Sequence, residues 1–242
     1  MDIARKGMLM GLILLVACST YTGKGSSTQP GISKRAKVSA PMHKKMDASE
    51  KDHKSHDTSH NGKAVHWTYS GEDGPNHWGE LSPDYAACDG KNQSPINLTG
   101  FIEADLKPID FTYHAGGKEI VNNGHTVQIN YKAGSRIVVD GTPFELKQFH
   151  FHAPSENDID GQSYPMEVHL VHASKEGHLA VIGVMFVDGA ENKTLAKAWS
   201  HVPEKADSHH ALLVPVAAAG LLPAKREYYR FNGSLTTPPC SE

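Results

Sequence analysis

From Trp67 onward, apolar residues alternate with polar ones in short runs, a pattern typical of β-strands. Residues 125–132, HTVQINYK, place Val127, Ile129 and Tyr131 on one face of such a strand. The run at 178–187, HLAVIGVMFV, is almost wholly apolar and predicts a buried strand. Three further strands are predicted, at 136–139, 144–152 and 166–173.

Helical periodicity is scarce in this part of the chain. Residues 192–201 form the best candidate, opening at Asn192 and ending before Pro203. Turns rather than helices separate the predicted strands. We therefore expect a predominantly β (α+β) fold, in which short peripheral helices surround a large, mixed but mostly antiparallel central sheet.

The N-terminus has the pattern of an export signal. Arg5 and Lys6 precede a short apolar run, 8–16, that is well below the roughly 20 residues needed to span a bilayer. The run ends in Leu-Val-Ala before Cys18, which resembles a bacterial lipobox. We expect 1–17 to be a lipoprotein signal peptide and Cys18 to carry the lipid; the alternative is a secreted protein with an incidental cysteine.

Residues 18–64 are rich in Ser, Thr, Lys, Gly and His and have few large apolar side chains. Such a segment buries too little surface to offset its ordering entropy, which predicts a disordered tether. Basic residues exceed acidic ones in it, which suits an anionic membrane surface. Acidic residues exceed basic ones in the predicted domain, 65–242, although the whole chain carries only -3, so nucleic acid is not an expected partner.

The remaining cysteines follow from this location. The chain has three, and lipidation of Cys18 leaves Cys88 and Cys240. Disulfides persist in exported proteins, so we expect these two to form a bridge. The predicted location is the periplasm or the cell surface, lipid-anchored to the outer membrane in a Gram-negative host.

The stretch QFHFH, 148–152, predicts the chemistry. On a strand, Gln148, His150 and His152 point to one face, and the two phenylalanines point to the other. A chance amphipathic strand would look the same, so this pattern alone decides little.

A second strand adds the third histidine. In MEVHLVHA, 166–173, Glu167 and His169 share a face, and the polar, turn-rich segment before it predicts a hairpin. His169 would then lie beside the first pair. Three neutral imidazoles suit zinc, and three protein ligands leave the open position of a catalytic site.

Each strand also places a polar residue two positions before a histidine. Gln148 precedes His150, and Glu167 precedes His169. Metal-bound histidines need their second ring nitrogen held by such groups, so the repetition favours a metal site over a merely polar sheet face.

Several motifs together resemble the α-class, eukaryotic-type carbonic anhydrases. They are QFHFH, EVHLVH at 167–172, NNGH at 122–125, SLTTPP at 234–239, HWTYSGEDGPNHW at 66–78 and NQSPINL at 92–98. The resemblance implies a carbonate dehydratase, a lyase (EC 4.2.1.1) that reversibly hydrates CO2 to bicarbonate and a proton with Zn²⁺ held by His150, His152 and His169.

The resemblance also implies roles for other residues. Thr236 would accept a hydrogen bond from the attacking oxygen and donate its own to Glu156, and Thr237 would line the substrate side. His125 would transfer the proton and Tyr69 would help to order water. The apolar pocket for CO2 would be formed by Val171, Val181 and Leu235.

One departure and two alternatives accompany the resemblance. Members of this family continue past the position of Glu242 through further strands, so we expect a chain that is truncated at the C-terminus and lacks the usual partner of His152. The spacing of His150, His152 and Glu156 also resembles a cupin, in which the glutamate binds iron or manganese. A non-catalytic surface binding module on the same scaffold is the other alternative, although no zinc histidine is lost.

Overall fold

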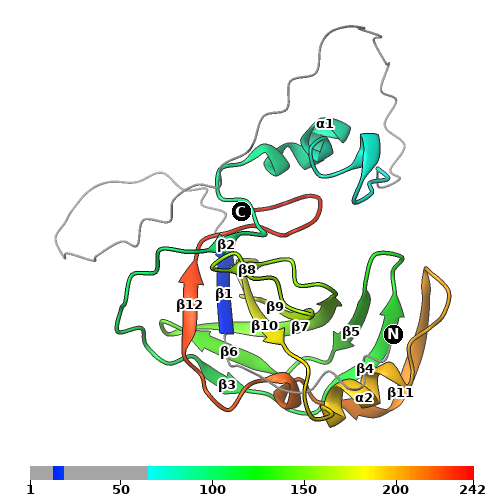
Figure 1. Cartoon of the computed structure of the whole chain (residues 1–242). Helices are drawn as coiled ribbons and strands as arrows, with labels where there is room; N and C mark the ends of the chain where they lie inside the picture. The colour runs from blue at the N-terminus through cyan, green and yellow to red at the C-terminus, as the bar shows by residue number, and fades with distance from the viewer. Residues whose placement is uncertain (1–12, 19–64) are drawn as a thin grey trace, which may run out of the picture.

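The computed structural model describes residues 13–18 and 65–242. Its main feature is a ten-stranded sheet. Eight of the strands follow the order β11-β4-β5-β7-β9-β10-β1-β12, and the other two are β6, which pairs with β7, and β3, which pairs with β6 (Figure 1). The strands are β1 (Ile13–Cys18), β3 (Asp110–Thr112), β4 (Gly117–Asn122), β5 (Val127–Tyr131), β6 (Arg136–Val139), β7 (Thr142–His152), β9 (Met166–Ala173), β10 (Leu179–Phe186), β11 (Ser208–Val216) and β12 (Tyr228–Phe231).

Nearly all the pairings in this sheet are antiparallel, and β1 with β12 is the parallel exception. A separate parallel pair joins β2 (Asn97–Leu98) to β8 (Asp158–Ile159). This confirms the prediction of a mostly antiparallel central sheet, and the five strands predicted from the hydrophobic pattern are all present, within two residues at their ends.

Helices are short and lie around the sheet (Figure 1). They are α1 (Trp78–Leu81), α2 (Lys193–Trp199) and three 3-10 turns, Gly71–Asp73, Pro83–Asp89 and Ala218–Leu221. The predicted start of α2 is confirmed, because the Asn192 side chain accepts hydrogen bonds from the backbone N–H groups of Thr194 and Leu195.

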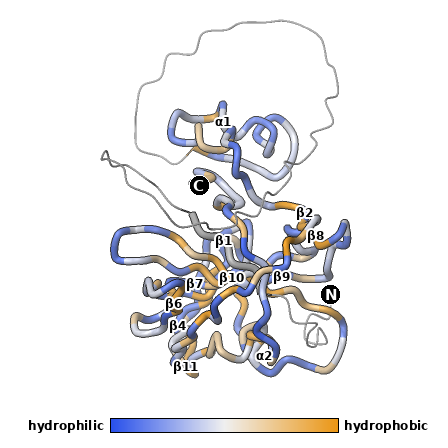
Figure 2. The backbone as a smooth tube through the Cα atoms, turned by 90° about the vertical axis from the view of Figure 1, so that its left-hand side faces the viewer, coloured by the Kyte–Doolittle hydropathy of each residue, from blue (hydrophilic) through white to orange (hydrophobic). Residues whose placement is uncertain are grey.

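The core lies behind the face that carries the histidines. Apolar and polar residues alternate along the strands (Figure 2), and Phe149 and Phe151 point into the buried side of the sheet. Phe151 meets the ring of Trp199 from α2 at 4.5 Å. Packing on this face fixes the strand's rotation, so the alternate residues of β7 must face the other way.

The strand β1 comprises the last five residues of the segment predicted as a signal peptide, together with Cys18. It runs antiparallel to β10 and parallel to β12, with Ile13 opposite Val184 and Tyr228. The rest of that predicted segment, 1–12, and the predicted tether from 19 to 64 lie outside the described residues. Within the part that is described, no helix is long and apolar enough to cross a bilayer.

The predicted disulfide is confirmed. Cys88 and Cys240 are bonded, with their Cα atoms 4.8 Å apart across a sequence separation of 152 residues. Such a bond is typical of a protein located outside the cytoplasm.

Candidate active site

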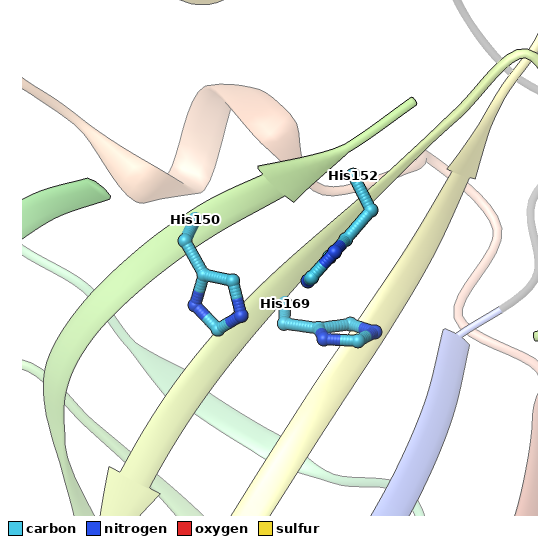
Figure 3. Close-up of side chains that lie close together, drawn as sticks. All are labelled: His150, His152 and His169. Atoms are coloured by element: carbon cyan, nitrogen blue, oxygen red, sulfur yellow. The ribbon is translucent and has the colours of Figure 1, made fainter. Parts of the chain in front are cut away.

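Three histidines converge on the open face of the sheet. His150 and His152 project from β7, and His169 projects from β9 directly opposite His150 (Figure 3). One nitrogen from each ring lies within 4.8 Å of the other two. The antiparallel register between β7 and β9 therefore places the three imidazoles as the sequence predicted.

Two of the rings are held from behind by the expected side chains. The Nδ1–H of His150 donates to Gln148 Oε1 at 2.9 Å. His169 Nε2 lies 2.9 Å from Glu167 Oε1, and since a carboxylate only accepts, the ring nitrogen donates. These contacts leave His150 Nε2 and His169 Nδ1 available as ligands.

The third ring has a partner that the sequence did not indicate. His152 Nδ1 lies 3.2 Å from Glu156 Oε1, a contact that the sequence analysis did not predict. Its Nε2 is buried and has no hydrogen-bond partner, and the same is true of Glu156 Oε2. An unpartnered buried imidazole nitrogen beside two others fits a metal ion.

The pKa values of the ligands reflect this setting. Burial, and then the neighbouring imidazoles, lower the pKa of His150 and bring that of His152 to about 3. Burial also acts against a charge on His169, but the charge and hydrogen bond of Glu167, together with the charge of Glu156, outweigh it and raise the pKa of His169. His150 and His152 are therefore neutral and can act as metal ligands. His169 lies beside the Glu167 carboxylate, which favours a positive charge such as a bound cation would supply.

Glu167 links the metal site to the loop after β7. Its Oε1 accepts from the Asn157 side chain at 2.9 Å, and its Oε2 accepts from the backbone N–H groups of Glu156 and Asn157 at 3.0 Å. Burial alone would raise the pKa of Glu167, but His169 and these donors keep it below its usual value. Glu167 therefore fixes both a ligand and the backbone that carries Glu156.

A cavity of about 200 Å³ opens beside the histidines. Its apolar wall contains Val171, Val181 and Leu235, the residues predicted for the substrate pocket, and Thr236 and Thr237 also line it. This cavity places apolar surface next to the imidazoles, as an uncharged substrate requires.

Thr236 contacts the carboxyl group of Glu156. Burial raises the pKa of Glu156, while His169 and a hydrogen bond from the Thr236 side chain oppose the rise. The threonine hydroxyl has a single proton, so donation to Glu156 leaves its lone pairs directed elsewhere.

A second cavity, of about 130 Å³, leads from the histidines to His125. Asn123 shapes this turn, because its side-chain oxygen accepts from the backbone N–H groups of His125 and Thr126. The exposed ring of His125 stacks on Trp67, with centroids 3.9 Å apart and planes 12° apart. Tyr69 lines the same cavity, and burial followed by the charge of Glu156 raises its pKa to about 12.

The loop that carries the two threonines is tied to the N-terminal part of the domain. Ser94 and Ser234 exchange hydrogen bonds, each backbone N–H donating to the other hydroxyl, at 2.9 and 3.2 Å. The disulfide of Cys240 closes the same loop. Two distant segments therefore cooperate to position Thr236.

Sequence reasoning missed three residues of the site: Trp67, Asn157 and Gly183. Gly183 lies opposite His169 in the β9–β10 pairing and lines the larger cavity. A glycine inside the apolar run 178–187 indicates a close approach, and that signal was present. Nothing in the local pattern around Trp67 indicated a stack on His125.

Comparisons with known proteins agree with this geometry. A family model described as "Eukaryotic-type carbonic anhydrase" matches residues 73–242. A carbonic anhydrase from Pectobacterium carotovorum is 49% identical over 180 residues, which cover 74% of this chain and 74% of that protein. A carbonic anhydrase from Neisseria gonorrhoeae is 44% identical over 183 residues, covering 75% and 72%.

Solved structures show the same architecture. A hyperthermostable carbonic anhydrase from a hydrothermal vent chimney has a TM-score of 0.71 at 54% identity, covering 73% of this chain and 79% of that one. The α-carbonic anhydrase of Thermovibrio ammonificans, in complex with sulfanilamide, has a TM-score of 0.72 at 48% identity, covering 74% and 80%. On this agreement of sequence, fold and histidine geometry, the chain belongs to the eukaryotic-type carbonic anhydrase family.

Proposed function

We propose how the residues of this carbonic anhydrase divide the conversion of CO2 and water to bicarbonate and a proton. The observation that carries the mechanism is the cluster of three imidazole nitrogens within 4.8 Å, each ring held from behind, beside an apolar cavity. His150, His152 and His169 hold Zn²⁺, which when bound polarises water so that it can act as a nucleophile at neutral pH.

Thr236 orients the reacting water. Its hydroxyl donates to the buried Glu156 carboxyl, so it can only accept from the water, and this fixes a lone pair of the water toward the carbon of CO2. Glu156 also lies 3.2 Å from His152 Nδ1, so one carboxyl group holds both a ligand and the threonine.

The apolar wall binds CO2 without hydrating it. Val171, Val181 and Leu235 offer no hydrogen-bond donor to the substrate, whereas the product bicarbonate is charged and leaves such a surface readily. Thr237 lines both cavities and lies on the substrate side of the site.

His125 removes the proton. It lines the smaller cavity together with His150 and His152, and its exposed ring can exchange protons with buffer. Tyr69 lines the same cavity, and its phenol, with a pKa raised to about 12, stays protonated at neutral pH and can order water there.

The test is a ligand variant with two measurements. We expect His169→Ala to lose zinc and CO2 hydration together, measured by metal analysis and stopped-flow hydration. His178→Ala, a histidine outside the site, is the control. Unchanged hydration in His169→Ala would refute the mechanism, and iron or manganese bound with Glu156 as a ligand would favour the cupin alternative. If the unmodified protein binds zinc but does not hydrate CO2, the alternative of a non-catalytic binding module would be favoured.

We also propose that the protein is exported and anchored to a membrane by a lipid on Cys18. The basic start, the short apolar run and the lipobox-like ending support this, and the disulfide supports a location outside the cytoplasm. The intact mass of membrane-extracted protein tests it. A diacylglyceryl-modified chain beginning at Cys18 is expected, and an unmodified Cys18 would refute the anchor.

A further inference from the structure

Three polar side chains on β4 and β5 continue the row of site residues away from the metal ligands. Asn130 lies opposite Glu119 on one side and Gln148 on the other, while Gln128 lies opposite His150. The Asn130 amide donates to Glu119 Oε2 at 2.5 Å, and the Gln128 amide donates to Asn130 Oδ1 at 2.7 Å. Glu119, Asn130 and Gln128 have no role in the proposed binding of zinc or CO2.

The carboxylate gives this chain of bonds a direction. A carboxylate can only accept, so the Asn130 amide must turn its nitrogen toward Glu119 and its oxygen toward Gln128. Gln128 must then turn its nitrogen toward Asn130. The carbonyl oxygen of Gln128 is consequently left for the cavity, although an isolated glutamine could present either end.

The neighbouring glutamine is fixed in the same way but with opposite polarity. Gln148 uses its oxygen to accept from His150 Nδ1–H, which leaves its nitrogen as the group it can offer to water. Gln128 and Gln148 both line the smaller cavity, between the ligands and His125. The wall of this cavity therefore presents an acceptor at Gln128 and a donor at Gln148.

We propose that Glu119 is a positioning residue for proton transfer. Through Asn130 it fixes the Gln128 carbonyl as an acceptor for the water between the zinc site and His125. A proton moves along a row of waters only if their O–H bonds point consistently, and a fixed acceptor in the wall imposes one orientation. The inference rests on the proposed role of His125.

Glu119→Gln is the test because it keeps the shape of the side chain but no longer fixes the direction of the hydrogen bonds. A glutamine can offer Asn130 either an oxygen or a nitrogen, so the side-chain amides of Asn130 and Gln128 are free to turn over together. We expect kcat to fall by roughly 2- to 10-fold, the range of one neutral hydrogen bond, while kcat/KM stays unchanged. A small diffusible base such as imidazole should restore kcat, because it bypasses His125.

Two further variants sharpen the result. In Glu119→Lys the ammonium group can only donate, so it reverses the direction of the hydrogen bonds through Asn130 and Gln128. The fall of kcat should therefore be at least as large as in Glu119→Gln. Glu145→Gln is the matched control: this carboxylate accepts from Lys147 and from the backbone of Gly134 elsewhere on the sheet. Unchanged kcat in Glu119→Gln would overturn the proposal, and an equal fall of kcat and kcat/KM would show structural support instead.

A measurement without zinc separates this inference from the catalytic mechanism. In the metal-free protein, the side-chain amide protons of Asn130 should resonate downfield because one donates to a carboxylate, and Glu119→Gln should move that signal upfield. An unmoved signal would overturn the proposed direction whatever the activity. If wild-type His125 proves unimportant for kcat while the signal moves, the proposed proton path fails and the hydrogen-bond direction stands.

Discussion

Replacing Glu167 by glutamine should weaken zinc binding although it changes a single atom. The carboxylate is completely buried and is surrounded by four donors. Oε1 receives hydrogen bonds from His169 Nε2 and the Asn157 amide, both at 2.9 Å. Oε2 receives two backbone N–H groups at 3.0 Å. An amide nitrogen at either position must face donors.

The hydrogen bonds around this side chain can rearrange only on the Oε1 side. Backbone N–H groups cannot reverse, so the glutamine nitrogen should take the Oε1 side. Asn157 cannot turn over freely either, because its oxygen accepts from the backbone N–H of Ile96 at 2.9 Å. His169 can adapt by moving its proton from Nε2 to Nδ1, which is the nitrogen that faces the other two histidines.

That tautomer blocks a ligand. To bind, zinc must displace the Nδ1 proton, and the proton that returns to Nε2 then faces the amide N–H groups of the glutamine. Loss of the hydrogen-bond partner behind a metal ligand typically costs 10- to 100-fold in affinity, about 1.4 to 2.7 kcal/mol. The unsatisfied donors should also lower the free energy of unfolding of the metal-free protein by about 1 to 3 kcal/mol.

Competition with a chelator measures the zinc affinity, and urea unfolding of the metal-free protein measures the stability. Glu145→Gln removes a partly exposed carboxylate on β7; it is the control and should change neither quantity. A zinc affinity of Glu167→Gln within about twofold of wild type would refute the argument, because the tautomer of His169 would then not depend on this carboxylate.

Three further predictions follow from other parts of the structure. Replacing both Cys88 and Cys240 by alanine should lower the free energy of unfolding by up to about 5 kcal/mol, the chain-entropy value for a 152-residue separation, and a urea-measured change below about 1 kcal/mol would contradict this. His172 is buried between Tyr113 and the Ala180 carbonyl, and burial lowers its pKa to about 4. Because the unfolded chain takes up the proton first, the free energy of unfolding should fall by about 3 kcal/mol as pH falls from 6.5 to 4. In pH-dependent unfolding, His172→Gln should lack that slope. Thr236→Ala should reduce kcat/KM for CO2 hydration by roughly 100-fold while Thr236→Ser retains most of it, and equal rates in the two variants would contradict a role for the hydroxyl.

The zinc site could be predicted because strand periodicity leaves little freedom. Residues two apart on a strand share a face, so QFHFH and EVH each determined a ligand together with the side chain behind it. A hairpin was enough to bring His150 opposite His169. Long-range register mattered only for this one pairing.

The other parts of the site depend on paths that no local pattern encodes. Trp67 reaches His125 through an irregular segment, so its stack could not be inferred from alternation. Glu156 was expected to contact Thr236 only, and its second role beside His152 arises from the way Glu167 folds the backbone after β7. The strand β4, GKEIVN, went unpredicted because charged residues interrupt its apolar positions.

The sequence of the apolar run at Ile13–Cys18 predicts an export signal that is cleaved off, whereas the structure places the run in the sheet. A short run without periodicity fits both an export signal and a buried strand, and here it forms β1 beside β10. Cleavage before Cys18 would remove all but one residue of β1. The backbone groups of β10 that pair with β1 would then need another strand or would face water, in a strand of which seven of eight residues are buried. In protein whose mass shows cleavage at Cys18, we therefore expect the β10 amides that face β1 to exchange hydrogen faster than those that face β9. Equal protection of the two sets would show that another strand takes the place of β1, since an open edge cannot protect its own amides.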